Sequence, residues 1–211
     1  MNYELIKRIL SSAVLIPVIL FFIIEGAYLF NIFILVCLII SIYEWNKMNK
    51  NAGYKIAGIL FLIFSFYSAY YLRFKIDDDY LHFIMILFIC IFTDTGGYVF
   101  GKIFKGPRLT KISPNKTYAG VFGGYLFSII FIIIFFKYFN EKELSIYNIF
   151  FTVVISTISQ IGDIFISYFK RLSKIKNSGN LIPGHGGILD RIDGMLFAFP
   201  FSFLMFLLLK I

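Results

Sequence analysis

The 211-residue sequence contains little charge, since only 15% of its residues are Asp, Glu, Lys or Arg, whereas 59% are hydrophobic. This composition excludes an ordinary soluble domain, in which about a quarter of the residues are charged. Several apolar runs reach the ~20 residues that a helix needs to cross the ~30 Å hydrocarbon core of a membrane. They lack the alternation of barrel strands, so the sequence predicts an all-α, polytopic bundle of transmembrane helices.

Cysteine and histidine are also scarce, with two of each in the chain. Cys37 and Cys90 lie in different apolar runs, where we expect them to fill the core and not to form a disulfide. His185 stands between glycines. A role as hydrogen-bond donor to a phosphate, or in constraining the turn, fits this position better than a role as metal ligand. The sequence therefore lacks the Cys/His cluster that binds zinc, and its candidate metal ligands are carboxylates.

Seven apolar segments are predicted as spans, at about residues 9–24, 27–43, 56–72, 80–100, 119–139, 147–169 and 188–209. With the N-terminus in the cytoplasm, 15 of the 20 Lys and Arg residues fall on the cytoplasmic side, as the positive-inside rule requires. The polar loops 101–118 and 170–187 then both face the cytoplasm. Because the net charge of +8 resides in such loops, it indicates membrane orientation and argues against a nucleic-acid partner.

The sequence predicts two parts, because the first three spans carry few ionisable groups and the later ones carry more. We expect residues 1–78 to form a scaffold of about three spans, with Glu44 and Trp45 at a membrane interface, and residues 79–211 to form a catalytic transmembrane domain. Asp94 stands inside the fourth apolar run, where an isolated charge costs about 3 kcal/mol. It therefore requires a partner, either in a structural hydrogen bond or in a binding site.

The loop after this run combines hydroxyl groups with cations, in Ser113, Lys116 and Thr117. Because the N-terminus of a helix attracts anions, this set is a candidate phosphate site where the fifth span begins. An ordinary positive-inside loop explains the composition equally well. Gly120 and Gly124 then give the fifth span a small-residue face for close helix packing.

The densest group of reactive side chains lies around the loop between the sixth and seventh spans. Asp163, Ser167 and Lys170 share one face of the sixth helix, and Asp190 and Asp193 share one face of the seventh. If these helices are adjacent, the hairpin brings Asp163 towards the other two carboxylates. Such carboxylates, completed by water and substrate phosphate, suit magnesium.

The same loop supplies partners for phosphate. Lys170 and Arg171 can neutralise phosphate oxygens, or anchor the chain at the membrane surface. The turn around His185, Gly186 and Gly187 can present backbone amides to an anion. Together these groups indicate phosphoryl or nucleotidyl transfer to a phosphate carried by a lipid. A phosphate monoester is already ionised near pH 7, so this chemistry needs no dedicated general base.

A long gapped pattern connects these residues: Ser167-x-x-Lys170-Arg171, Lys176, then Pro183-Gly184-His185-Gly186-Gly187-x-x-Asp190-Arg191-x-Asp193. It resembles the signature of the phosphatidate cytidylyltransferases (CDP-diacylglycerol synthases). Supporting matches lie at 94–98, 113–117 and 160–163. The resemblance covers about residues 90–211, and the first 90 residues match only as hydrophobic spans.

The resemblance implies an inner-membrane enzyme, with its site facing the cytoplasm, that acts in phospholipid biosynthesis. Such an enzyme transfers a cytidylyl group from CTP to phosphatidic acid and releases pyrophosphate and CDP-diacylglycerol. It also implies magnesium, a second, monovalent cation such as potassium, and a homodimer. By this resemblance Asp163 and Asp190 would hold the metal and Asp193 would assist, while Lys170 and Arg171 would face phosphates. The implied substrate-binding residues are Asp94, Ser113, Lys116, Thr117, Ser167, His185, Gly186 and Gly187.

Three positions depart from the family pattern. Family members usually carry aspartate where Asn177 stands, often glutamate where Ala119 stands, and commonly alanine where Gly97 stands. The first two departures remove carboxylates, which leaves open reduced metal affinity, altered specificity or a degenerate homologue.

Other functions fit parts of the pattern. A CTP-dependent polyprenol or lipid kinase would use the same groups, and a cation transporter would use Asp94 and Asp163 as ligands inside the membrane. A CDP-alcohol phosphotransferase fits less well, because the run from Asp190 to Asp193 lacks that family's longer aspartate pattern.

Overall fold

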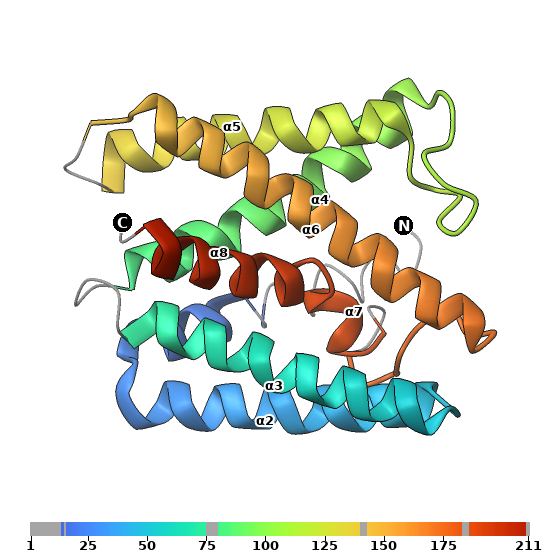
Figure 1. The fold of residues 1–211 in the computed structure, drawn as a ribbon. Coiled ribbons are helices and arrows are strands. Elements are labelled where there is room, and N and C mark those ends of the chain that lie inside the picture. The colour runs from blue at the N-terminus through green and yellow to red at the C-terminus, as the bar shows by residue number, and fades with distance from the viewer. Residues whose placement is uncertain (1–13, 15, 75–79, 140–142, 183–185, 210–211) are drawn as a thin grey trace. The chain divides into compact units, whose positions relative to one another are not determined.

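The computed structural model describes residues 14, 16–74, 80–139, 143–182 and 186–209, and these ranges are almost entirely helices and their connecting loops (Figure 1). A short helix, Ile16–Glu25, comes first. The other helices are α2 (Ala27–Met48), α3 (Ala52–Phe74), α4 (Leu81–Phe104), α5 (Tyr118–Phe139), α6 (Ile146–Leu172), α7 (Leu189–Ile192) and α8 (Met195–Leu209). Within these ranges the only β-structure is isolated β-bridges, with no strands. The predicted all-α class is therefore confirmed.

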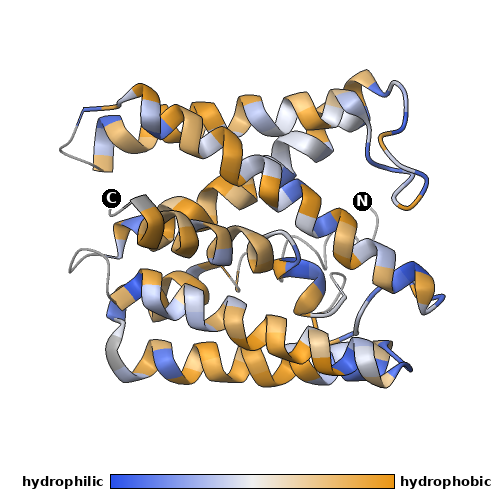
Figure 2. Cartoon of the chain, in the orientation of Figure 1, coloured by the Kyte–Doolittle hydropathy of each residue, from blue (hydrophilic) through white to orange (hydrophobic). Residues whose placement is uncertain are grey.

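Five helices, α2 to α6, are long and apolar enough to cross a membrane, and two shorter apolar helices accompany them. Hydrophobic residues dominate the helices, whereas hydrophilic residues gather at helix ends and in loops (Figure 2). The chain is therefore a multi-pass membrane protein, as its composition predicted.

The seventh predicted span is interrupted. The sequence predicted one helix over residues 188–209, but α7 ends at Ile192 and α8 begins at Met195. The amides of Phe197 and Ala198 both donate to the Gly194 carbonyl, which opens a new helix. A Cβ atom on Gly194 would overlap the hydroxyl of Ser159 on α6, so glycine at the break lets α8 lie close to α6.

The described chain forms two compact units. The first unit comprises Met1–Tyr80 and Phe169–Asp193, and the second comprises Leu81–Tyr168 and Gly194–Ile211. Helix α6 runs from the second unit into the first. The boundary after Tyr80 lies close to the predicted division at 78/79, but the loop after α6 and α7 belong to the same unit as the N-terminal helices. The scaffold and catalytic roles given to the two halves stay predictions.

Glycines bring α4 and α5 together in the second unit. A Cβ atom on Gly96 would overlap the carbonyl oxygen of Gly123, and one on Gly120 would lie 2.8 Å from the Gly97 carbonyl oxygen. A Cβ on Gly124 would lie 3.0 Å from the Thr93 carbonyl oxygen. The helices thus meet backbone to backbone, which confirms the small-residue face predicted for the fifth span.

A buried arginine holds the N-terminal helices of the first unit together. Arg73, near the end of α3, is 8% exposed, and its Nε donates to the Ile23 carbonyl at 2.9 Å. Its guanidinium also lies over the rings of Phe30, Phe74 and Tyr80, at 5.2–6.0 Å. Arg73 therefore satisfies a carbonyl in the last turn of the first helix, where carbonyl groups need partners from outside the helix.

Candidate active site

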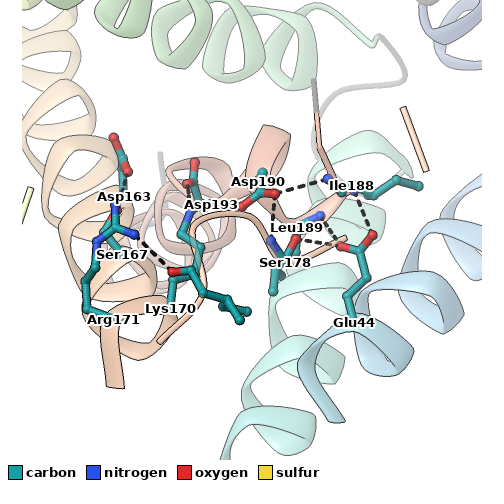
Figure 3. Close-up of polar contacts among 12 residues, drawn as sticks. Glu44, Asp163, Ser167, Lys170, Arg171, Ser178, Ile188, Leu189, Asp190 and Asp193 are labelled. Carbon is teal, nitrogen blue, oxygen red and sulfur yellow. Dashed lines mark hydrogen bonds and ion pairs between the residues drawn. The ribbon is translucent and has the colours of Figure 1, made fainter. Parts of the chain in front are cut away.

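Two predicted carboxylates and a predicted phosphate-binding lysine form one buried cluster in the first unit. Lys170 Nζ lies 2.9 Å from Asp190 Oδ1 and 3.6 Å from Asp193 Oδ2 (Figure 3). The three side chains are between 5% and 10% exposed. Lys170 comes from the end of α6, whereas Asp190 lies in α7 and Asp193 directly follows it. The two aspartates, three residues apart, both turn towards the Lys170 ammonium. The sequence predicted that they share a face, but it assigned Lys170 to phosphate.

The second oxygen of Asp190 is held by the polypeptide backbone. Asp190 Oδ2 accepts hydrogen bonds from the amides of Ser178 and Gly187, at 2.8 and 3.0 Å. With Lys170 on the first oxygen, this carboxylate has three donors. A buried charge needs such a shell, because removal of one partner from a buried ion pair costs about 3–5 kcal/mol. Asp190 is therefore fixed in one orientation.

Glu44 is a buried carboxylate of the first unit that the sequence analysis did not select as a site residue. It lies near the end of α2, is 3% exposed, and accepts hydrogen bonds from the Ser178 hydroxyl and from the amides of Ile188 and Leu189. The sequence analysis assigned it to the scaffold. The argument that singled out Asp94, a carboxylate within an apolar run, applied equally to Glu44 and was the available signal.

The backbone amides of residues 186–189, at the described end of the glycine-rich turn, have acceptors within the chain. Gly186 donates to the Ile182 carbonyl at 3.1 Å, Gly187 donates to Asp190, and the next two amides donate to Glu44. Gly186 has a φ of 91°, and a Cβ atom there would lie 2.7 Å from Asp190 Oδ2. The anions held by the amides of residues 187–189 are the protein's own carboxylates, Asp190 and Glu44. Substrate binding by Gly186 and Gly187 stays a prediction.

A second pair of predicted residues meets in the second unit. Lys116 Nζ forms an ion pair with Asp163 Oδ2 and donates to the Gln160 carbonyl at 3.3 Å. Asp163 Oδ1 accepts a hydrogen bond from Ser167, one turn along α6, at 3.2 Å. The Lys116 and Asp163 side chains are 21% and 26% exposed. The loop before α5 therefore reaches the predicted carboxylate of α6 through its lysine.

Thr117 caps the helix that follows this loop. Its Oγ1 accepts a hydrogen bond from the Gly120 amide at 3.1 Å, and the residue is 9% exposed. The loop is closed at the same point, because the Leu109 amide donates to the Lys116 carbonyl at 2.8 Å. Thr117 thus has a structural role in starting α5, and its role in substrate binding, like that of Ser113, stays a prediction.

The remaining predicted residues fall in three different places. Arg171 is exposed, and its Nη1 donates to the Ile175 carbonyl at 3.0 Å, next to the end of α6. Asp94 is exposed on α4. His185 lies outside the described residues. The predicted approach of Asp163 to Asp190 also stays a prediction, because these residues belong to different units.

The donor chemistry of the buried cluster fits magnesium. Two carboxylates converge on the Lys170 ammonium, and one or two carboxylates, completed by water and substrate phosphates, are the usual protein contribution to a magnesium site. Among the residues that the structure describes, no three His, Cys, Asp or Glu side chains form a ready metal-ligand group. A metal here would therefore rely on substrate oxygens as well as on protein.

Comparisons with known proteins agree with the resemblance noted in the sequence. A model of the Cytidylyltransferase family matches residues 6–82 and 71–209. A phosphatidate cytidylyltransferase of Rickettsia conorii is 35% identical over 211 residues, covering 94% of this chain and 89% of the relative. That of Rickettsia felis is 33% identical, covering 95% and 92%, and that of Staphylococcus haemolyticus is 34% identical, covering 79% and 65%.

These matches extend the resemblance. The sequence analysis limited it to about residues 90–211, but the family model also matches the N-terminal helices, which include Glu44. That limit was wrong, because the signature residues that carried it lie only in the C-terminal part. On this match, and on relatives that align along most of their length, the chain belongs to the Cytidylyltransferase family.

Proposed function

We propose that the protein transfers a cytidylyl group from CTP to phosphatidic acid, giving CDP-diacylglycerol and pyrophosphate. The observation that carries the proposal is the family match, which runs through both units and includes the residues of the buried cluster. The relatives reported above bear the name of this activity. A multi-pass membrane chain suits an acceptor that resides in the bilayer.

The reaction requires close approach of two anions. A phosphate oxygen of phosphatidic acid attacks the α-phosphorus of CTP, and a new P–O bond forms. The bond from the α-phosphorus to the oxygen bridging towards the β-phosphate breaks, and pyrophosphate leaves with that electron pair. Because attacking and leaving groups are both negatively charged, the protein's main tasks are positioning and charge neutralisation.

Lys170 and Lys116 are suited to these tasks. Each ammonium is paired with a carboxylate in the structure. The more exposed Lys116 can move its contact to a phosphate oxygen when substrate arrives, whereas Lys170 stays with its carboxylates and keeps positive charge beside them. Asp190 is held by two amides as well as by Lys170, so it keeps one orientation. The exposed guanidinium of Arg171 offers a further cation at the end of the same helix.

Magnesium is part of the proposal, with Asp190 and Asp193 as its ligands in the first unit and Asp163 as a third candidate. When bound, it would neutralise phosphate charge during the transfer. The second, monovalent cation stays a prediction. An active site that faces the cytoplasm in the inner membrane is proposed from the positive loops 101–118 and 170–187, and a homodimer from the resemblance alone.

The mass of the lipid product tests the proposal and separates it from the alternatives. Purified protein in mixed micelles is supplied with phosphatidic acid, magnesium and CTP, and the lipid is analysed by mass spectrometry. The proposal predicts a lipid that has gained a cytidylyl group, with equimolar pyrophosphate. A polyprenol or lipid kinase would give a lipid that has gained one phosphate, with CDP released. A transporter would leave both lipid and CTP unchanged and move cations across vesicles.

A further inference from the structure

The carboxylate of Glu44 has a complete set of donors from the loop that follows α6. Its Oε1 accepts from the Ile188 amide at 3.1 Å, and its Oε2 accepts from the Leu189 amide and the Ser178 hydroxyl, both at 2.9 Å (Figure 3). The residue is 3% exposed. Hydrogen bonds to a charged group are stronger than neutral ones, so three of them tie the loop firmly to α2.

Two glycines make room for this carboxylate. A Cβ atom on Gly179 or on Gly187 would overlap the Glu44 carboxylate oxygens. The loop backbone therefore closes round Glu44 from two sides, at a distance that other residues would not permit. The fit shows that this part of the loop is shaped around an acidic side chain of α2.

The same loop residues also hold Asp190. Ser178 donates through its hydroxyl to Glu44 and through its amide to Asp190. Gly187 donates its amide to Asp190, and the next two amides donate to Glu44. Because adjoining donors are divided between the two carboxylates, movement of Glu44 shifts the groups that orient Asp190, and through Asp190 the ammonium of Lys170.

The end of α2 is itself well anchored. Trp45, next to Glu44, is 4% exposed, and its Nε1 donates to the Tyr54 carbonyl at 3.0 Å. Its ring packs on Phe169, with centroids 5.0 Å apart, one residue before Lys170. Gly58 on α3 leaves room for the Trp45 indole, because glycine lacks the Cβ atom that would overlap the ring. Glu44 therefore projects from a fixed element of the first unit.

We propose that Glu44 is a positioning residue for cytidylyl transfer, which acts by holding Ser178, Ile188 and Leu189, and through them Asp190 and Lys170. This inference rests on the proposed function. It gives the N-terminal helices a part in the reaction, where the sequence predicted only a scaffold. Glu44 does not touch the substrate in this account; it fixes the groups that do.

The test compares Glu44→Gln with Glu25→Gln in the full-length protein. Both substitutions replace a carboxylate in the first unit by an amide, but Glu25 is exposed. The Glu44→Gln side chain would turn an NH2 group towards loop donors, so the amides of Ile188 and Leu189 should exchange with solvent about ten-fold faster. We expect kcat per CTP-binding site to fall about 10- to 100-fold, as for other residues that orient a site. KM for CTP and phosphatidic acid should stay within about three-fold, because contacts with substrate are unchanged.

Two further variants keep the test decisive. Glu44→Asp retains the charge on a shorter side chain and should give kcat between wild type and Glu44→Gln. Ser178→Ala removes one hydrogen bond to Glu44 and replaces Glu44→Gln in the test if that variant does not fold. It should accelerate amide exchange only at residues 178, 188 and 189, and should lower kcat about three- to ten-fold.

Three results for Glu44→Gln would overturn the inference. The first is unchanged amide exchange at Ile188 and Leu189, and the second is faster exchange there with kcat unchanged. The third is faster exchange throughout α2 and α3, which would mean that Glu44 supports the fold in general. If the wild-type protein makes no CDP-lipid, the proposed function fails instead. The exchange measurement needs no substrate, so the two failures are distinguishable.

Discussion

The two lysine–aspartate contacts of this protein differ in how firmly they are held. In the buried cluster of Lys170, Asp190 and Asp193, the side chains are 5–10% exposed, and two backbone amides complete the shell of Asp190. In the half-buried pair of Lys116 and Asp163, exposure is 21–26%. Asp163 also accepts a hydrogen bond from Ser167, which lies on the same helix.

The difference separates a fixed cluster in the first unit from an adaptable pair in the second. Charges in a buried pair depend on each other, because either alone would be desolvated without compensation. A less buried pair contributes less to stability and exchanges partners more easily. We therefore expect the buried cluster to contribute to both fold and reaction, and the half-buried pair to contribute to the reaction alone.

Asp190→Asn should give the largest effect. It leaves the Lys170 charge with a weakened counter-ion and sets an NH2 group against backbone donors, so the free energy of unfolding should fall by about 3 kcal/mol. Transfer should be lost by at least about a thousand-fold, since charge neutralisation is the main catalytic term. Thermal unfolding in detergent and label transfer from CTP measure the two quantities. A variant with wild-type turnover would remove Asp190 from the site.

Asp163→Asn is the matched test in the second unit. Turnover should again be abolished, but the free energy of unfolding should change by less than about 1 kcal/mol, because the pair is less buried than the Lys170 cluster. The same two measurements apply. An unfolding midpoint lowered as far as in Asp190→Asn would erase the difference between the clusters, and retained activity would remove Asp163 from the proposed metal site.

Gly186→Ala probes the shell of the buried cluster, with Gly106→Ala as its control. Both glycines have positive φ, 91° and 95°, but a Cβ at position 186 meets the Asp190 carboxylate, whereas none of the described atoms lies within 4 Å at position 106. Each change costs about 1–2 kcal/mol of backbone strain. Only Gly186→Ala should also lower kcat, by about 10- to 100-fold. Equal kcat values for the two variants would contradict the role assigned to this shell.

Ser167→Ala should give the smallest effect. It removes one hydrogen bond to Asp163, worth about 1 kcal/mol, from a carboxylate that keeps its lysine partner. We expect a less than ten-fold loss of kcat and little change in the unfolding midpoint. A loss as large as that of Asp163→Asn would show that Ser167 contacts substrate directly, as the resemblance implied.

The sequence predicted the features that depend on local pattern. Apolar runs located the helices, because hydrophobic length is readable residue by residue. Glycine spacing predicted a small-residue face on the fifth span, and the three-residue spacing of Asp190 and Asp193 predicted that they lie on one face. In each case neighbours in sequence determine the geometry.

Features that depend on distant residues were missed. Glu44 meets its donors 134 to 145 residues further along the chain, a pairing that no local pattern reveals. Likewise, spacing could not show that the amides of residues 187–189 donate to Asp190 and Glu44. The break at Gly194 was hidden for a similar reason: hydrophobicity continues across it, and only the contact with Ser159 explains the glycine.

The most direct test of the account is label transfer by the purified wild-type protein. CTP labelled on the α-phosphate is mixed with micelles of phosphatidic acid, and label is followed into the lipid with and without magnesium. The account predicts transfer that requires both phosphatidic acid and magnesium, which would also show that Asn177 and Ala119 are compatible with activity. Folded protein that binds CTP but transfers no label would contradict it.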